Sequence, residues 1–131
     1  YEDQAKELGV FDNIEIVKRV EHKNIYNYIA QSTVGVLSNR YDADGLLFTS
    51  PLKLYEYLGS GLKVVVSRLP SIESNINESL VYYATPEKPE SFAKEIIRAL
   101  DDDDFDINKI KDFSKNYTWE SRSKKFMEFI S

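Results

Sequence analysis

The sequence predicts a doubly wound α/β fold, in which helices flank a parallel sheet, and three observations support this prediction. Apolar β-branched runs alternate along the chain with segments whose apolar residues recur every three or four positions. Such alternation is typical of βαβ units. The chain has 131 residues, about the size of one domain, and 42% of them are hydrophobic, enough to fill one core. It also has no internal repeat and no long linker.

The first half of the chain predicts two helices and two strands. Residues 1–8 form an amphipathic helix pattern that Gly9 closes, and residues 14–20 are β-branched and partly alternating, which predicts a strand. Residues 24–31 carry apolar side chains at helical spacing. The short apolar run 33–37 predicts a buried strand.

The second half continues the alternation. It predicts strands over residues 63–67 and 80–84 and helices over residues 51–58, 72–76, 89–100, 107–115 and 119–130.

The composition excludes several function classes. Basic residues number 17 against 22 acidic ones, a formal net charge of −5, which argues against a general nucleic-acid binder. The absence of cysteine excludes disulfides, thiolate metal sites and cysteine nucleophiles. No apolar run approaches the roughly 20 residues of a membrane span. Neither a P-loop nor a G-x-G-x-x-G motif occurs, and one histidine makes a Ser-His-Asp triad implausible.

One segment combines features of a phosphate site and a sugar site. Ser50 is a natural N-cap and Pro51 a natural first helical residue. The free amides of Leu52 and Lys53 would then point out of the helix start, where the helix dipole favours an anion. The Lys53 ammonium adds positive charge, and Glu56 lies on the same face and suits paired sugar hydroxyls. In the alternative interpretation, Ser50 alone satisfies the helix start, and Lys53 and Glu56 form an ordinary surface pair.

This segment carries a resemblance to a known family. Residues 50–70, SPLKLYEYLGSGLKVVVSRLP, resemble the signature of the C-terminal, donor-binding domain of group 1 glycosyltransferases with the GT-B fold. Residues 80–84 followed by 86–100 are similar to the family's late strand and helix, and residues 117–122 to the opening of its terminal helix. The resemblance implies a Rossmann-like sheet.

The resemblance also implies site residues. Glu56 stands where the family's glutamate holds the ribose hydroxyls of a sugar nucleotide, and Leu52 and Lys53 stand where helix-start amides hold the diphosphate. Thr49 and Ser50 are within reach of the same phosphates or of the sugar.

The nucleobase is held in the family by the loop after the strand predicted at residues 14–20, largely through backbone groups. Arg19, Val20 and Glu21 are the corresponding residues here. No metal and no cofactor are expected beyond the nucleotide-sugar substrate, because helix dipoles and basic residues stabilise the leaving diphosphate in such enzymes. The catalytic residues stay unassigned.

Two departures from the family pattern stand out. Phe48 occupies the position of the first glutamate of the family's E-x7-E motif. Two βα units that normally open the donor domain have no counterpart, and their strands would lie between those at 14–20 and 33–37. We therefore expect a gap in the sheet. Either the strands pair differently, or another chain fills the gap, or the sequence is part of a longer polypeptide.

These implications define the expected function. Residues 1–131 would be a single nucleotide-sugar-binding domain, with a terminal helix over 117–131, from a longer bacterial-type GT-B enzyme. With its missing N-terminal domain, that enzyme would transfer a hexose to an acceptor, whereas this chain alone would be inactive. We expect a cytoplasmic protein and no nucleic-acid partner, and leave open a homo-oligomer and a peripheral membrane association of the full enzyme. The alternative is a degenerate, non-catalytic GT-B-like interaction module.

Several other residues have both a functional and a structural interpretation. His22 could approach a base or a phosphate, but a lone histidine in an exposed loop is more simply a polar surface residue. Tyr26, Tyr28 and three other tyrosines (Tyr55, Tyr57 and Tyr82) fall at core-like spacings, which predicts packing. The acidic run at residues 101–104 predicts a solvated helix exit.

Overall fold

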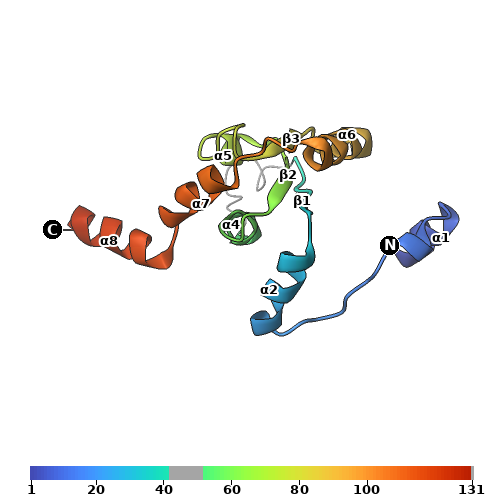
Figure 1. The fold of residues 1–131 in the computed structure, drawn as a ribbon, viewed down its shortest axis with the longest axis horizontal. Coiled ribbons are helices and arrows are strands. Elements are labelled where there is room, and N and C mark those ends of the chain that lie inside the picture. The colour runs from blue at the N-terminus through green and yellow to red at the C-terminus, as the bar shows by residue number, and fades with distance from the viewer. Residues whose placement is uncertain (42–51, 131) are drawn as a thin grey trace.

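The computed structural model, which describes residues 1–41 and 52–130, confirms the α/β fold class (Figure 1). The described residues form a three-stranded parallel sheet in the order β1-β2-β3, with β1 at Val34–Leu37, β2 at Lys63–Ser67 and β3 at Tyr82–Ala84. In the register, Val36 of β1 stands beside Val65 of β2. Each strand lies within a predicted one.

Helices surround this sheet and begin where the sequence favours a start. Pro70 and Pro89 occupy the first turns of their helices, where a missing amide proton costs nothing. Asp106 caps another helix by accepting hydrogen bonds from the amides of Asn108 and Lys109. The helices are α1 (Glu2–Glu7), the 3₁₀ turn η1 (Phe11–Asn13), α2 (His22–Gln31), α4 (Leu52–Gly59), α5 (Pro70–Glu73), α6 (Pro89–Asp101), α7 (Ile107–Lys115) and α8 (Trp119–Ile130).

The core lies on both faces of the sheet. On one face, Leu54 and Leu58 of α4 pack with Val64 of β2, and α5 and α7 complete this side. On the other face, α6 covers Val65 through its buried Ala99 (Figure 1). Because strand side chains alternate between faces, the continuous apolar run of β2 fills both cores at once.

Residues 14–20 are not a strand, so this prediction is wrong. The backbone is extended at Ile14 (φ −121°, ψ 123°), but no ladder pairs it with the sheet. Ile14, Ile16 and Val17 keep 45%, 47% and 44% of their surface exposed. A strand needs a hydrogen-bonded neighbour, and in Figure 1 this stretch runs from α1 to α2 at a distance from β1. Within the described ranges no strand lies beyond β1, so β1 is an edge of the sheet rather than one side of a gap between two strands.

The two ends of the chain extend away from the sheet. Figure 1 shows α1 and α8 at opposite ends of the molecule, with α4, α7 and the strands between them. Phe126 and Phe129 of α8 are 62% and 87% exposed, so they do not anchor this helix onto the core. Among residues 1–41 and 52–130, no helix combines the length and apolar character that crossing a membrane requires.

Candidate functional site

A cleft of about 850 Å³ runs along α4, and α4 forms its floor. Leu54 and Leu58, one turn apart, bury one side of α4 against the sheet. The other side then faces outward and contributes Leu52, Tyr55, Glu56, Gly59 and Ser60, the last just beyond the helix, to the cleft lining. The volume lies within the range typical of small-molecule sites.

Two further segments form the walls of this cleft. One wall is α2, which contributes His22 and Tyr26. The other is α7 and the residues after it, which contribute Lys111, Ser114, Lys115, Tyr117 and Thr118. Gly61 lets the chain leave α4 with a φ of +77°, a conformation that glycine adopts without steric cost, and it lies close to Lys111.

The carboxylate of Glu56 meets the imidazole of His22 across the cleft. Glu56 Oε1 lies 3.8 Å from His22 Nε2, and the side chains are 31% and 74% exposed. The pair is thus open to solvent and to a ligand. His22 belongs to the first turn of α2, so the expectation that it lies in a loop is wrong.

Aromatic rings line both walls. On the α7 side, Tyr117 stacks on Tyr55 at 5.0 Å and meets Phe113 at 4.6 Å, which fixes the end of α7 to α4. On the α2 side, Tyr26 meets His22 edge-to-face at 6.1 Å. Tyr26 is 51% exposed and Tyr28 is 48% exposed. The prediction that these two tyrosines pack in the core is therefore wrong, because α2 turns away from the sheet (Figure 1).

Cations lie at the α7 wall. Lys115 pairs with Asp112 at 2.6 Å, and Lys111 stands one turn earlier on the same face. Both lysines are exposed.

The structure brings two of the predicted site residues into this cleft, Glu56 and Leu52. Lys53 is exposed on α4 but is not among the residues that line the cleft. Thr49 and Ser50 lie outside the described residues. The roles predicted for these residues stay predictions.

The residues predicted to hold the base do not line the cleft. Arg19 and Glu21 are exposed and Val20 is half-buried, all just before α2. Glu21 pairs with Lys23 at 2.8 Å. Their expected position depended on a strand at residues 14–20, and the structure has no strand there.

Most of the wall residues are not among the site residues predicted from the sequence. His22 and Tyr26 are four residues apart, as are Lys111 and Lys115, so each pair shares one helical face. That spacing was a usable signal. What it could not show is that these two faces turn toward the same side of α4.

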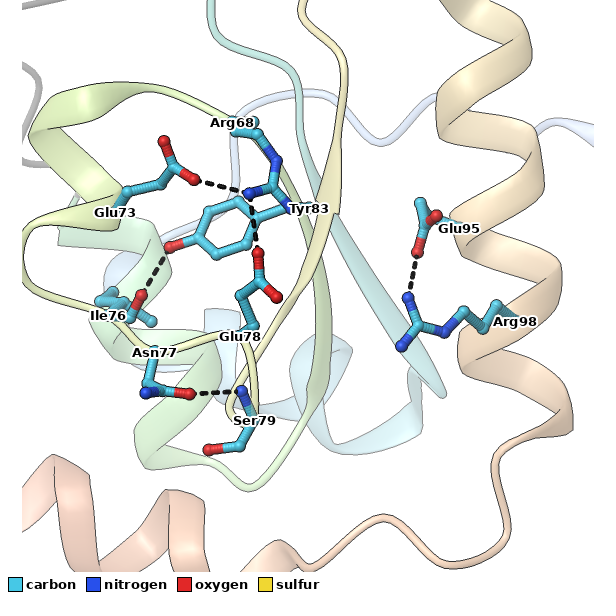
Figure 2. Close-up of polar contacts among 9 residues, drawn as sticks. All are labelled: Arg68, Glu73, Ile76, Asn77, Glu78, Ser79, Tyr83, Glu95 and Arg98. Carbon is cyan, nitrogen blue, oxygen red and sulfur yellow. Dashed lines mark hydrogen bonds and ion pairs between the residues drawn. The ribbon is translucent and has the colours of Figure 1, made fainter.

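At the carboxyl end of β2, Arg68 is held by protein groups rather than left open to a ligand. Its guanidinium donates to Glu73 at 2.6 Å and Glu78 at 2.7 Å, and it lies 4.8 Å from the ring centroid of Tyr83 (Figure 2). The hydrogen bond to Glu78 raises the pKa of Arg68, against the opposing effect of burial, and Glu73 adds to the rise. Two carboxylates neutralise this arginine, so it anchors α5 and the loop after it rather than offering charge to a phosphate.

In the described part of the chain, no group of three or more histidine and acidic side chains could hold a metal ion.

Residues 1–102 match the family model of glycosyl transferases group 1. A comparison with curated proteins finds no match.

Proposed function

The chain belongs to the group 1 glycosyl transferases, and from this premise we propose that it binds the nucleoside-diphosphate sugar from which the sugar is transferred. The observation that carries the proposal is the position of Glu56, whose partly exposed carboxylate lines the floor of the cleft one turn from the start of α4. A carboxylate accepts hydrogen bonds from two neighbouring hydroxyls, which is the chemistry that holds a ribose.

The start of α4 supports the diphosphate part of the proposal. Leu52 lies at the first turn of α4 and lines the cleft, and Glu56 follows it by one helical turn. A helix start attracts anions through its free amides and dipole, and Lys53 adds a positive charge on the same turn. A nucleotide could therefore place its phosphates at the helix start and its ribose at Glu56.

The transfer itself needs groups beyond these residues. We propose that the full enzyme moves a hexose to its acceptor and that this chain supplies the donor-binding part. On this proposal the 131-residue chain binds nucleotides weakly and turns nothing over.

Calorimetry on the 131-residue chain with UDP, GDP and ADP tests the proposal. At least one of the three should bind, and Glu56→Ala should weaken that binding about tenfold or more, since hydrogen bonds to a charged group contribute about 1.5–3 kcal/mol. Glu90→Ala, which removes an exposed carboxylate from α6, is the matched control and should bind like the wild type.

The phosphate assignment has its own test. Lys53→Ala should weaken the binding of a nucleoside diphosphate more than the binding of the free nucleoside, because only the diphosphate carries the negative charge that Lys53 attracts. Equal effects on both ligands would remove Lys53 from the phosphate site, and unchanged affinity in Glu56→Ala would remove Glu56 from the ribose site.

A further inference from the structure

We propose that His22 and Tyr26 of α2 form the nucleoside end of the cleft, with the base lying against the Tyr26 ring and the ribose hydroxyls facing both His22 and Glu56. This inference rests on the proposed function, and it adds two side chains and the chemical class that they recognise, a flat aromatic base joined to a ribose diol. His22 directly follows residues 19–21, the segment predicted to hold the base, and Tyr26 lies one helical turn further along α2.

The first step concerns the position of the two side chains. His22 and Tyr26 are four residues apart on α2 and therefore share one face of that helix. Both line the cleft whose floor is α4. Their rings meet edge-to-face at 6.1 Å with an angle of 82° between the planes, so one face of α2 places two adjoining aromatic rings at the cleft.

The second step identifies the ring on which a base can stack. Tyr117, on the opposite wall, already stacks on Tyr55 at 5.0 Å and contacts Phe113 at 4.6 Å. Tyr26 has a single ring contact among the described residues, with His22, and this contact covers at most one of its faces. Tyr26 is also 51% exposed, whereas Tyr55 and Tyr117 are half-buried, so the Tyr26 ring is the more accessible to a base.

The third step concerns the ribose. The Glu56 carboxylate only accepts hydrogen bonds, whereas a neutral imidazole has one donor and one acceptor nitrogen. Glu56 Oε1 and His22 Nε2 are 3.8 Å apart, close enough for two neighbouring hydroxyls to contact both groups. A ribose diol, in which each hydroxyl both donates and accepts, matches this pair.

The cleft offers a group suited to each part of a nucleotide. Leu52 at the start of α4 lies one turn before Glu56, and Glu56 faces His22, which is followed by Tyr26 one turn further along α2. Phosphate, ribose and base therefore each have a suitable group in the cleft.

Calorimetry on the 131-residue chain tests this arrangement with the best-binding nucleoside diphosphate of UDP, GDP and ADP, and with inorganic pyrophosphate as a probe that lacks a base. Tyr26→Ala should weaken the affinity for the nucleotide about 5- to 150-fold, which is the effect of losing one base–aromatic stack. The affinity for pyrophosphate should not change. Tyr26→Phe keeps the ring and should bind like the wild type. Tyr28→Ala removes an equally exposed tyrosine of α2 that lies outside the cleft lining and is the matched control.

For His22, the comparison uses a ribonucleotide and its 2′,3′-dideoxy analogue. His22→Ala should weaken the affinity for the ribonucleotide severalfold and leave the affinity for the dideoxy analogue nearly unchanged. Thermal unfolding of each variant shows whether the fold is intact.

The outcomes separate the two levels of the argument. If the wild type binds none of the three nucleotides, the proposed function fails and this inference with it. If the wild type binds and Glu56→Ala weakens binding, but Tyr26→Ala and His22→Ala bind as tightly as Tyr28→Ala, the inference alone is overturned.

Discussion

The hydroxyl of Ser67 at the end of β2 both accepts a hydrogen bond from the amide of Asn39 and donates one to its carbonyl, each at 2.8 Å. Ser67 is fully buried, and Asn39 follows the end of β1. One side chain therefore replaces a rung of the ladder where the two strands end. In doubly wound sheets ligands bind beyond these carboxyl ends, so this contact fixes the chain next to the region where a donor is expected.

Replacing Ser67 by alanine should destabilise the fold. Ser67→Ala leaves the amide and the carbonyl of Asn39 without these partners, and a buried unsatisfied group costs about 1–3 kcal/mol. Urea unfolding followed by circular dichroism measures the loss. Ser38→Ala removes an exposed hydroxyl one residue before Asn39 and should stay within about 0.5 kcal/mol of the wild type. Equal stability of the two variants would mean that the paired hydrogen bonds of Ser67 contribute nothing.

A side chain at Gly35 of β1 should also destabilise the fold, because the ring of Tyr57 lies directly over the glycine. A Cβ added there would stand 2.6 Å from Tyr57 Cδ2 and 2.9 Å from Leu62 Cδ2. Overpacking of this kind costs about 1–3 kcal/mol, so Gly35→Ala should lower the unfolding midpoint. Gly59→Ala is the matched control, since its Cβ meets nothing within 4 Å and alanine favours the helix. A Gly35→Ala variant as stable as Gly59→Ala would contradict this packing.

The contact between Glu56 and His22 should matter for ligand binding and contribute little to the stability of the fold. Glu56 and His22 contact each other at a solvent-exposed position, and even fully charged exposed pairs contribute only about 0–1 kcal/mol. Glu56→Ala and His22→Ala should therefore unfold within about 1 kcal/mol of the wild type while their nucleotide affinity falls. Thermal and urea unfolding of the variants used for calorimetry check this. A loss of several kcal/mol in either variant would show that the pair supports the fold.

The parts of the fold that the sequence predicted well are those determined by local pattern. The apolar run at 63–67 became β2 with the predicted bounds, and the amphipathic periods at 107–115 and 119–130 became α7 and α8. In these segments the local sequence pattern and the packing in the fold favour the same secondary structure.

The failures have a common physical origin in missing neighbours. Residues 14–20 have the composition of a strand, but strand formation depends on a hydrogen-bonded partner that no local pattern contains. Tyr26 has core-like spacing, yet α2 lies away from the sheet and leaves it half exposed. His22 became a cleft residue for the same reason, since its contact with Glu56 depends on how α2 and α4 are placed.

Alkaline pH should destabilise the protein through Tyr83. Its hydroxyl donates to the carbonyl of Ile76 at 2.7 Å, and burial, with a further contribution from the carboxylate of Glu73, raises its pKa to about 12. An unfolded chain has a tyrosine pKa of about 10. The protonated phenol therefore contributes stability fully below pH of about 10, and this contribution is lost as pH rises toward about 12.

Tyr83→Phe tests this dependence. At neutral pH the free energy of unfolding of the variant should be about 1 kcal/mol lower than that of the wild type, because the hydrogen bond is lost. Between pH of about 10 and 12, the stability of the variant should fall less than that of the wild type. Part of the fall should persist, because burial and the hydrogen bond to Asp102 also raise the pKa of Tyr82. Urea midpoints measured across this range, with exposed Tyr28→Phe as the control, give the comparison. If Tyr83→Phe and the wild type lose stability in parallel, Tyr83 is not the group that titrates, and its burial has no effect on the alkaline limit.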